Sequence, residues 1–214
     1  EFRPAPIWGH VRCIERIRRH ALDPTAHARN LASIAQEYPT IAGELAGVQL
    51  DPPDQPVSDD GADLEIGGRL IELRWLGRGH TDNDLVIRVP DAPVVFAGDL
   101  LENGAPPWLG DGYPLDWVAT IEAILELLPT PRSSEPGSSK PGVAVVPGHG
   151  DIGDRAFVER SLAEMRSIVD LAGRVHGGAI GLADAILAAP YPPDSAGEAL
   201  ARALGQLRGE LVSG

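Results

Sequence analysis

Hydrophobic and polar residues follow a helical period over the first part of the chain. Apolar residues recur at three-residue steps at Val11, Ile14 and Ile17, and this spacing predicts a helix. A second helix is predicted over about residues 24–38 by the same criterion. Residues 51–61 are rich in Asp and Pro, which predicts a loop.

From residue 63 the period becomes that of β-strands. Residues 63–66 and 69–75 flank the pair Gly67-Gly68, a pattern that predicts a β-hairpin with a tight glycine turn. Further strands are predicted at 84–89 and 93–97. Their apolar content is nearly continuous, which is typical of strands covered on both faces.

The rest of the chain combines one more strand with several helices. A helix is predicted near residues 115–128 with Asp116 as its N-cap, followed by an apolar strand at 143–146. Helical patterns predict three further helices, over about 154–175, 182–188 and 195–211. This order of elements indicates a layered α/β (α+β) protein. The length suits one globular domain over residues 1–214.

Composition and charge narrow the classes of partner. Hydrophobic residues make up 43% of the chain and charged residues 23%, as in ordinary globular proteins. The formal net charge is −13, which disfavours both nucleic acid and anionic membrane surfaces as partners. No apolar run approaches the roughly 20 residues that a membrane-spanning helix needs. We therefore expect a small-molecule partner, and the sequence leaves the oligomeric state open.

A single cysteine, Cys13, excludes an internal disulfide and a cysteine-rich zinc cage. Its isolation fits a reducing compartment, and we expect the protein to be cytoplasmic. The chain begins with Glu1 rather than Met. We expect it to be a piece of a longer protein.

Three short segments place metal-binding residue types beside glycine at the ends of predicted strands. They are Gly79-His80-Thr81, Gly98-Asp99 and Gly148-His149-Gly150. Glycine permits a sharp turn or a close backbone approach that a Cβ atom would block, and strand ends lie at the rim of a sheet, where a cleft can form. Each segment alone is also consistent with an ordinary turn or helix cap.

Together the three segments supply two imidazoles and one carboxylate, from His80, Asp99 and His149. That donor set suits zinc or iron better than calcium or magnesium, which prefer oxygen ligands. His10 follows an apparent strand end and precedes a helix, so we expect it to cap that helix rather than to bind a metal.

In this order and context, Gly-His-Thr, Gly-Asp and Pro-Gly-His-Gly resemble the motifs of the metallo-β-lactamase superfamily. The resemblance implies a four-layer αββα sandwich with two metal ions at one edge. By the same resemblance His80 would bind the first ion, Asp99 would bridge the two, and His149 would bind the second. The implied cofactor is Zn²⁺, two ions in the complete protein, with iron or manganese as possible replacements.

The chain departs from the family in one respect. The family's upstream His-x-His-x-Asp-His stretch, which supplies further metal ligands, does not occur in this sequence. We therefore expect that the N-terminal strands of the fold are missing from this chain and that the chain alone has weak activity or none. A non-catalytic binding module on the same fold is the alternative.

The resemblance implies a zinc-dependent hydrolase in which a hydroxide held between the two metal ions attacks an ester, thioester, lactone or amide bond. Asp99 would also accept a hydrogen bond from this nucleophile. A di-iron redox protein uses the same ligands and is a further alternative. Thr81, Asp82 and Asp84 are candidates to orient an imidazole ligand, while Trp108 and Tyr113 would either contact substrate or cover the core.

Overall fold

A computed structural model describes residues 5–45, 51–128 and 143–210. Contacts between residues divide the chain into two compact units, Glu1–Ser58 and Asp59–Gly214. Each unit is described by itself, and the expected single domain over residues 1–214 stays a prediction. None of the helices within the described ranges combines the length and apolar character that crossing a bilayer requires.

The first unit contains the two predicted helices and a small sheet. Its elements are β1 (Trp8–His10), α1 (Val11–Leu22), α2 (Pro24–Glu37), α3 (Ala42–Leu45) and β2 (Gln55–Val57). Strand β2 lies inside the segment that was predicted to be a loop, so that prediction is wrong for these residues. It pairs in parallel with β1, and Pro56 stands opposite Gly9. A two-stranded sheet has only edge strands, where proline is tolerated, so composition alone hides this strand.

His10 caps helix α1, as predicted. Its Nδ1 atom accepts a hydrogen bond from the backbone N–H of Arg12 at 3.3 Å. The imidazole is buried, and its Nε2 atom lies 3.4 Å from the Arg12 guanidinium. The side chain therefore satisfies one of the free N–H groups at the start of the helix.

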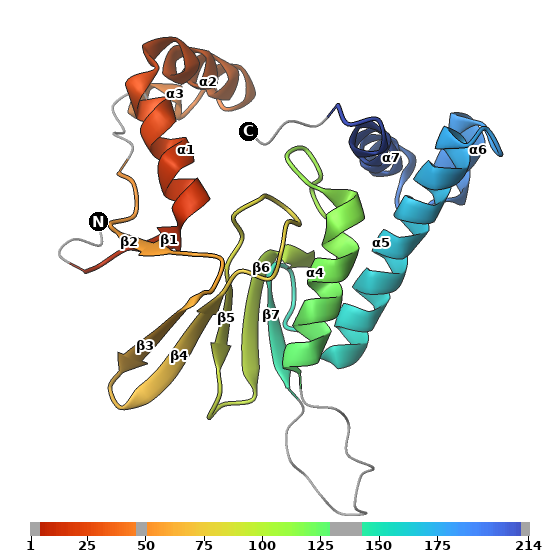
Figure 1. The fold of residues 1–214 in the computed structure, drawn as a ribbon. Helices are drawn as coiled ribbons and strands as arrows, with labels where there is room; N and C mark the ends of the chain where they lie inside the picture. The colour runs from red at the N-terminus through yellow and green to blue at the C-terminus, as the bar shows by residue number, and fades with distance from the viewer. Residues whose placement is uncertain (1–4, 46–50, 129–142, 211–214) are drawn as a thin grey trace, which may run out of the picture. The chain divides into compact units, whose positions relative to one another are not determined.

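The second unit is built on one five-stranded sheet (Figure 1). Its strands run in the order β3-β4-β5-β6-β7, with bounds Ala62–Ile66, Arg69–Arg74, Val86–Val89, Val94–Glu102 and Ala144–His149. Pairing is antiparallel from β3 to β6 and parallel between β6 and β7. The hairpin β3–β4 turns at Gly67 and Gly68, which have φ values of 62° and 79°. Two successive positive φ angles match the turn that such hairpins prefer, so the predicted hairpin is confirmed.

Helices cover one face of this sheet. Val86, Val95 and Val145 point to that face and are buried in the main hydrophobic cluster. On the other face Phe96 pairs in register with Ile87 and Val146, yet its side chain is exposed. Since successive residues of a strand alternate between faces, the expected coverage of both faces is not found at Phe96 in the described part of the unit.

Four helices follow or separate these strands, namely α4 (Pro114–Leu127), α5 (Arg155–His176), α6 (Leu182–Ala188) and α7 (Pro193–Leu207). Asp116 does not cap α4, because Pro114 occupies its first turn and Tyr113 takes the cap position. Proline favours the first helical position, since its fixed φ suits the helix and its missing N–H would be unpaired there anyway. Asp154 caps α5 by accepting from the N–H of Phe157 at 3.0 Å.

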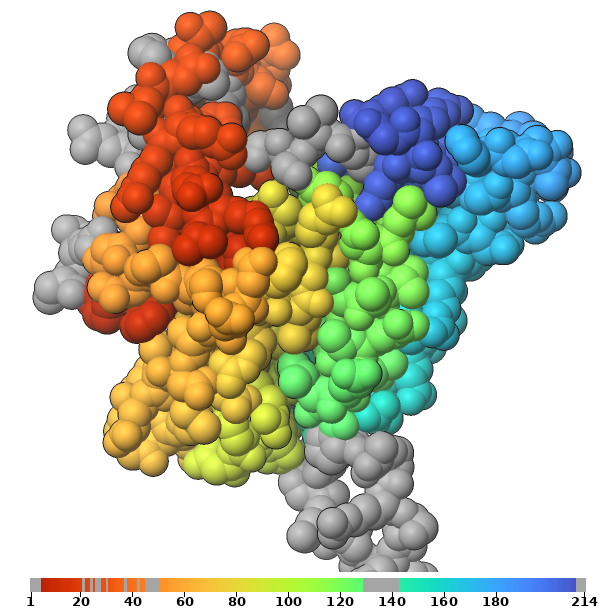
Figure 2. Space-filling view, viewed as in Figure 1, coloured from red at the N-terminus to blue at the C-terminus, as the bar shows by residue number. Residues whose placement is uncertain are grey.

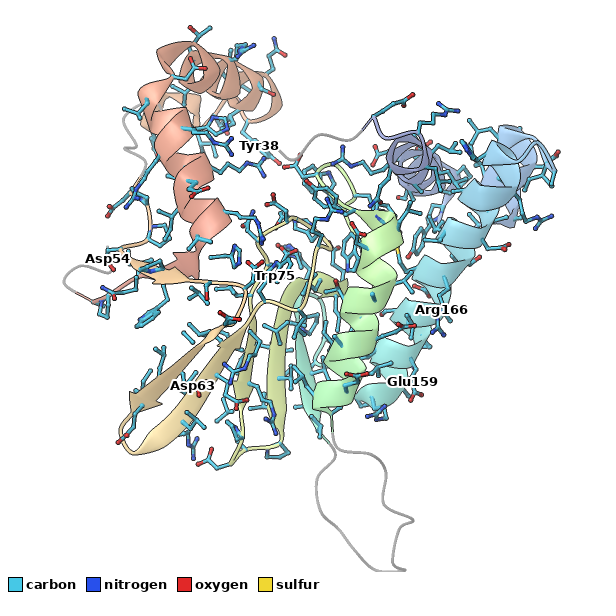
Figure 3. The ribbon with its side chains drawn as sticks, in the orientation of Figure 1. Tyr38, Asp54, Asp63, Trp75, Glu159 and Arg166 are labelled. Carbon is cyan, nitrogen blue, oxygen red and sulfur yellow. The ribbon has the colours of Figure 1, made fainter. Side chains whose placement is uncertain are left out.

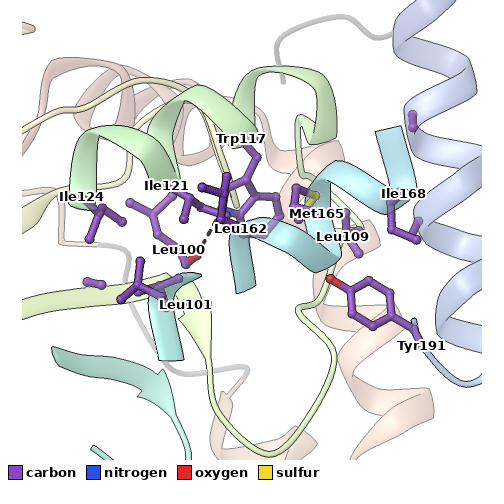
Figure 4. Packing of buried hydrophobic residues seen from close by; sticks show 14 of the residues in the cluster. Leu100, Leu101, Leu109, Trp117, Ile121, Ile124, Leu162, Met165, Ile168 and Tyr191 are labelled. Atoms are coloured by element: carbon purple, nitrogen blue, oxygen red, sulfur yellow. Dashed lines mark hydrogen bonds between the residues drawn. The ribbon is translucent and has the colours of Figure 1, made fainter. Parts of the chain in front are cut away.

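The core of this unit lies between the sheet and helices α4, α5 and α7 (Figure 4). Trp117 is fully buried, and its indole Nε1–H donates to the Leu100 carbonyl at 3.1 Å. In Figure 2 the surface of α4 (green) continues directly into that of α5 (cyan). The sequence therefore forms the expected α/β architecture, with the helical layer fixed against β5, β6 and β7.

We expect Arg155 to fasten the C-terminal end of α4. Its guanidinium donates to the carbonyls of Leu125 and Leu128, both at 2.8 Å. Replacing Arg155 with Met removes these charge-assisted hydrogen bonds and should lower the free energy of unfolding by about 2 kcal/mol, measured by urea denaturation. The matched control is Arg166→Met on the same helix (Figure 3). Its exposed ion pair with Glu122 should be worth less than about 0.5 kcal/mol, and equal losses for both variants would contradict the prediction.

Candidate metal centre

The sequence predicts that Asp99 follows the end of a strand. In the structure Asp99 lies inside β6 instead. The register between β6 and β7 shifts on both sides of Gly98 and resumes with Glu102 opposite His149. Gly98 has a φ of 55°, a conformation that glycine adopts without strain. Such bulges bend a strand and redirect a side chain while pairing continues beyond them.

The structure brings the three predicted ligands together around Asp99. His80 Nε2 lies 3.8 Å from Asp99 Oδ2, and His149 Nε2 lies 3.5 Å from Asp99 Oδ1. The two imidazoles therefore approach different oxygens of one carboxylate. Exposed side-chain fractions rise from 15% for His80 through 41% for Asp99 to 71% for His149. Whether these side chains bind metal stays a prediction.

Two glycines beside the histidines are required by close packing. A Cβ on Gly148 would collide with Oδ1 of Asp99 and come within 2.8 Å of its backbone nitrogen. A Cβ on Gly79 would collide with Leu100 and lie 3.1 Å from the Trp117 ring. Glycine at these two positions thus allows the segments that carry the histidines to approach β6.

His80 is oriented by a backbone carbonyl. Its Nδ1 atom lies 3.2 Å from the carbonyl oxygen of Trp108, and its ring centroid is 5.6 Å from that of Trp108 and 6.1 Å from that of Trp117. A carbonyl only accepts, so this contact requires the proton on Nδ1 and leaves the Nε2 lone pair for the side of Asp99. The sequence analysis did not find this partner, because it is a backbone carbonyl that any residue type could supply and it lies 28 residues away.

The three residues expected to orient an imidazole, Thr81, Asp82 and Asp84, form hydrogen bonds within their own turn. Asp84 accepts from both the backbone N–H and the hydroxyl of Thr81 at 2.8 Å, and Asp82 accepts from Asn83 at 2.8 Å. Burial raises the pKa of Asp84, while the hydrogen bonds from Thr81 and the charge of His80 act in the opposite direction. Short side chains readily bond within their own turn in this way, and a role of any of these three residues in orienting an imidazole stays a prediction.

The segment that carries His149 is held by Asn103. The backbone N–H of Asn103 donates to the His149 carbonyl at 3.0 Å, and its side-chain amide donates to the Asp151 carbonyl at 2.8 Å. Gly150 between them has a φ of 85°. Asn103 is thus a positioning residue that the sequence analysis did not find.

The two aromatic residues of the following loop have different environments. Trp108 is 54% exposed, and its backbone N–H donates to Glu102 at 3.1 Å. Tyr113 is only 3% exposed. Tyr113 therefore covers the core, whereas Trp108 stands at the surface beside His80.

Comparison with known proteins identifies the family. A family profile described as the Metallo-beta-lactamase superfamily matches residues 8–151, which is more than half of the chain. The chain belongs to the metallo-β-lactamase superfamily. The predicted resemblance and the α/β fold class are thereby confirmed.

Curated relatives share limited identity with this superfamily member. The Metallo-beta-lactamase type 2 of Bacillus cereus is 29% identical over 102 residues, covering 46% of this chain and 36% of the relative. That of Elizabethkingia meningoseptica is 23% identical over 132 residues, covering 60% and 49%. The chain thus spans between about a third and a half of these relatives. A solved metallo-beta-lactamase from Pontibacter korlensis gives a TM-score of 0.45 at 21% identity, covering 63% of this chain and 62% of that one.

The donor set fits metal binding in chemistry but forms only part of a site. Two imidazoles and a carboxylate are ligands that zinc and iron accept. Within the ranges that the structure describes, however, no group of three or more His, Cys, Asp and Glu side chains has the arrangement to hold a metal ion.

Proposed function

We propose that this metallo-β-lactamase superfamily member is a zinc-dependent hydrolase that cleaves an ester, thioester, lactone or amide bond of a small molecule. The observation that carries the proposal is the placement of the Asp99 carboxylate within 4 Å of the Nε2 atoms of both His80 and His149. One shared carboxylate with an imidazole beside each oxygen would offer each of two ions one imidazole and one carboxylate oxygen.

In this proposal His80, Asp99 and His149 would supply ligands to two zinc ions. Bound zinc would supply a water of lowered pKa and a Lewis acid that polarises a carbonyl. The chain's own residues orient these ligands. The Trp108 carbonyl fixes the tautomer of His80, and Asn103 fixes the backbone of His149.

Asp99 and Trp108 are proposed to act on the substrate. Asp99 is 41% exposed and can accept a hydrogen bond from the attacking water. Trp108 presents a half-exposed ring whose backbone is fixed at both its N–H and its carbonyl. An aromatic ring held in this way offers a rigid apolar surface to the acyl part of a substrate.

The decisive experiment is a Zn²⁺ titration of the chain and of Asp99→Asn, which keeps the size of the side chain and removes its charge. We expect weak uptake by the chain, because a catalytic zinc ion normally has about three protein ligands. Asp99→Asn should weaken this uptake further, by at least about tenfold. Asp170→Asn, on the exposed side of α5, is the matched control and should bind as the unaltered chain does. Two tightly bound ions per chain would contradict the expected weak uptake, and equal affinity in all three proteins would contradict the proposal.

Substrate class is tested by a hydrolysis screen of the full-length protein with esters, thioesters, lactones, β-lactams and amides, each with and without a chelator. A non-catalytic binding module is the second candidate, favoured by the lack of a complete metal-binding group within the described ranges. That candidate predicts no chelator-sensitive hydrolysis of any of the five. Iron in place of zinc in the purified protein would instead favour a redox role.

A further inference from the structure

The C-terminal helix α7 presents two polar side chains toward the loop that contacts His80. Arg202 and Gln206 are four residues apart and therefore lie on the same side of the helix. The helix itself is fixed in the core by Ala199, Leu200 and Ala203, which are fully buried. The two polar side chains thus extend from a rigid support.

Arg202 binds the loop before α4. Its Nε–H donates to the Gly112 carbonyl at 2.6 Å, and its guanidinium carbon lies 5.7 Å from the centroid of the Tyr113 ring. A second guanidinium, that of Arg78, lies 4.6 Å from the same ring. Both distances fall within the range of cation–π attraction, so the buried ring is held by charge as well as by packing.

Gln206 binds the first turn of α4. Its Oε1 accepts from the backbone N–H of Leu115 at 2.9 Å, and its Nε2 donates to Asp116 Oδ2 at 2.9 Å. The same Asp116 oxygen lies 2.6 Å from the Arg78 guanidinium. Gln206 therefore supplies a free N–H of the helix start with an acceptor and ties Asp116 to Arg78.

These contacts lead directly to His80. The backbone N–H of Tyr113 donates to the Gly79 carbonyl at 2.8 Å, and Thr120 donates to the Arg78 carbonyl at 2.7 Å. The residues on the N-terminal side of His80 are thus bonded to the segment that α7 holds. At the other end of the loop, the Trp108 carbonyl contacts Nδ1 of the imidazole.

We propose that Arg202 and Gln206 are positioning residues for His80. Arg202 fixes the end of the loop at Gly112, and Gln206 fixes the first turn of α4 that follows it. Together they keep the Trp108 carbonyl on Nδ1 and the Nε2 atom toward Asp99. The inference rests on the proposed function, since it is as a metal ligand that His80 needs this orientation. The inference gives helix α7, which is remote from His80 in sequence, a role in the candidate metal centre.

The test compares Arg202→Met and Gln206→Met with the matched control Arg208→Met, an exposed arginine at the end of the same helix. The first readout is the tautomer of His80, from imidazole ¹⁵N shifts at about pH 8.5, well above the usual histidine pKa of about 6.5. The imidazole signals of His80 are identified as those that are missing from the spectrum of His80→Gln. We expect the Nδ1–H tautomer in the unaltered chain and in Arg208→Met, and a mixture of both tautomers in the other two variants.

The second readout is Zn²⁺ affinity, which should fall about tenfold in Arg202→Met and Gln206→Met. Arg202→Lys retains a cation and a donor, and should restore most of the tautomer preference. If Arg202→Met does not fold, Gln206→Met decides. An unchanged tautomer in Gln206→Met, or the same change in Arg208→Met, overturns the inference. Because the tautomer is read without metal or substrate, a failed hydrolysis screen refutes the proposed function and leaves this result standing.

Discussion

Gly148→Ala is expected to disrupt the candidate metal centre while leaving the rest of the fold in place. The added Cβ would collide with the Asp99 carboxylate. The backbone nitrogen of Asp99 is also too close to leave room for a methyl group. The neighbours of Gly148, Pro147 and His149, both pair with β6, so the backbone at Gly148 has little room to move away from Asp99. We expect a loss of about 1–3 kcal/mol in the free energy of unfolding, as in other overpacked sites.

The accompanying functional effect of Gly148→Ala is a loss of Zn²⁺ uptake. A displaced Asp99 carboxylate no longer lies near both imidazoles, so Zn²⁺ uptake should fall by at least about tenfold. Urea denaturation and Zn²⁺ titration measure the two effects separately. Gly173→Ala is the control, since an added methyl group there meets nothing within 4 Å and lies in helix α5. It should stabilise the protein by about 0.5–1 kcal/mol, and unchanged Zn²⁺ uptake in Gly148→Ala would contradict the prediction.

The sequence predicted those parts of the structure that depend on local patterns. The hairpin turn at Gly67-Gly68 and the helix over residues 182–188 follow from short-range preferences, and both are confirmed. Glycine beside His80 and His149 also indicated a close backbone approach, which the structure contains. Local chemistry sufficed because glycine's special freedom is visible in the sequence itself.

Other features depend on contacts that no local pattern encodes. The orientation of His80 comes from a backbone carbonyl, and the support of His149 comes from Asn103. The strand at residues 55–57 exists because a distant segment pairs with it. Asp116 has the composition of an N-cap, yet the adjacent Pro114 starts the helix earlier and leaves Asp116 for Arg78 and Gln206. Tertiary partners decided the first three cases, whereas a proline two residues away decided the position of the α4 cap.

Trp117→Ala is expected to have the largest effect on stability of any substitution considered. The indole is fully buried beneath His80, and its Nε1–H satisfies the Leu100 carbonyl. Removing the ring leaves a cavity in the core and should cost about 3–5 kcal/mol. Trp117→Phe separates the two contributions, because it keeps most of the volume and leaves the carbonyl unpaired, at a cost of about 1–3 kcal/mol. Urea denaturation of both variants measures these losses.

Trp108→Ala provides the matched comparison, because the two tryptophans flank the same imidazole from different environments. Trp108 is half-exposed, and its bonds to His80 and Glu102 use backbone atoms that alanine retains. Its loss should change the free energy of unfolding by less than about 0.5 kcal/mol. If both alanine variants lost similar stability, the exposed ring would be part of the core and unsuited to contact substrate. A large difference in stability between the two variants instead assigns Trp117 to the support of His80 and leaves the Trp108 ring available to contact substrate.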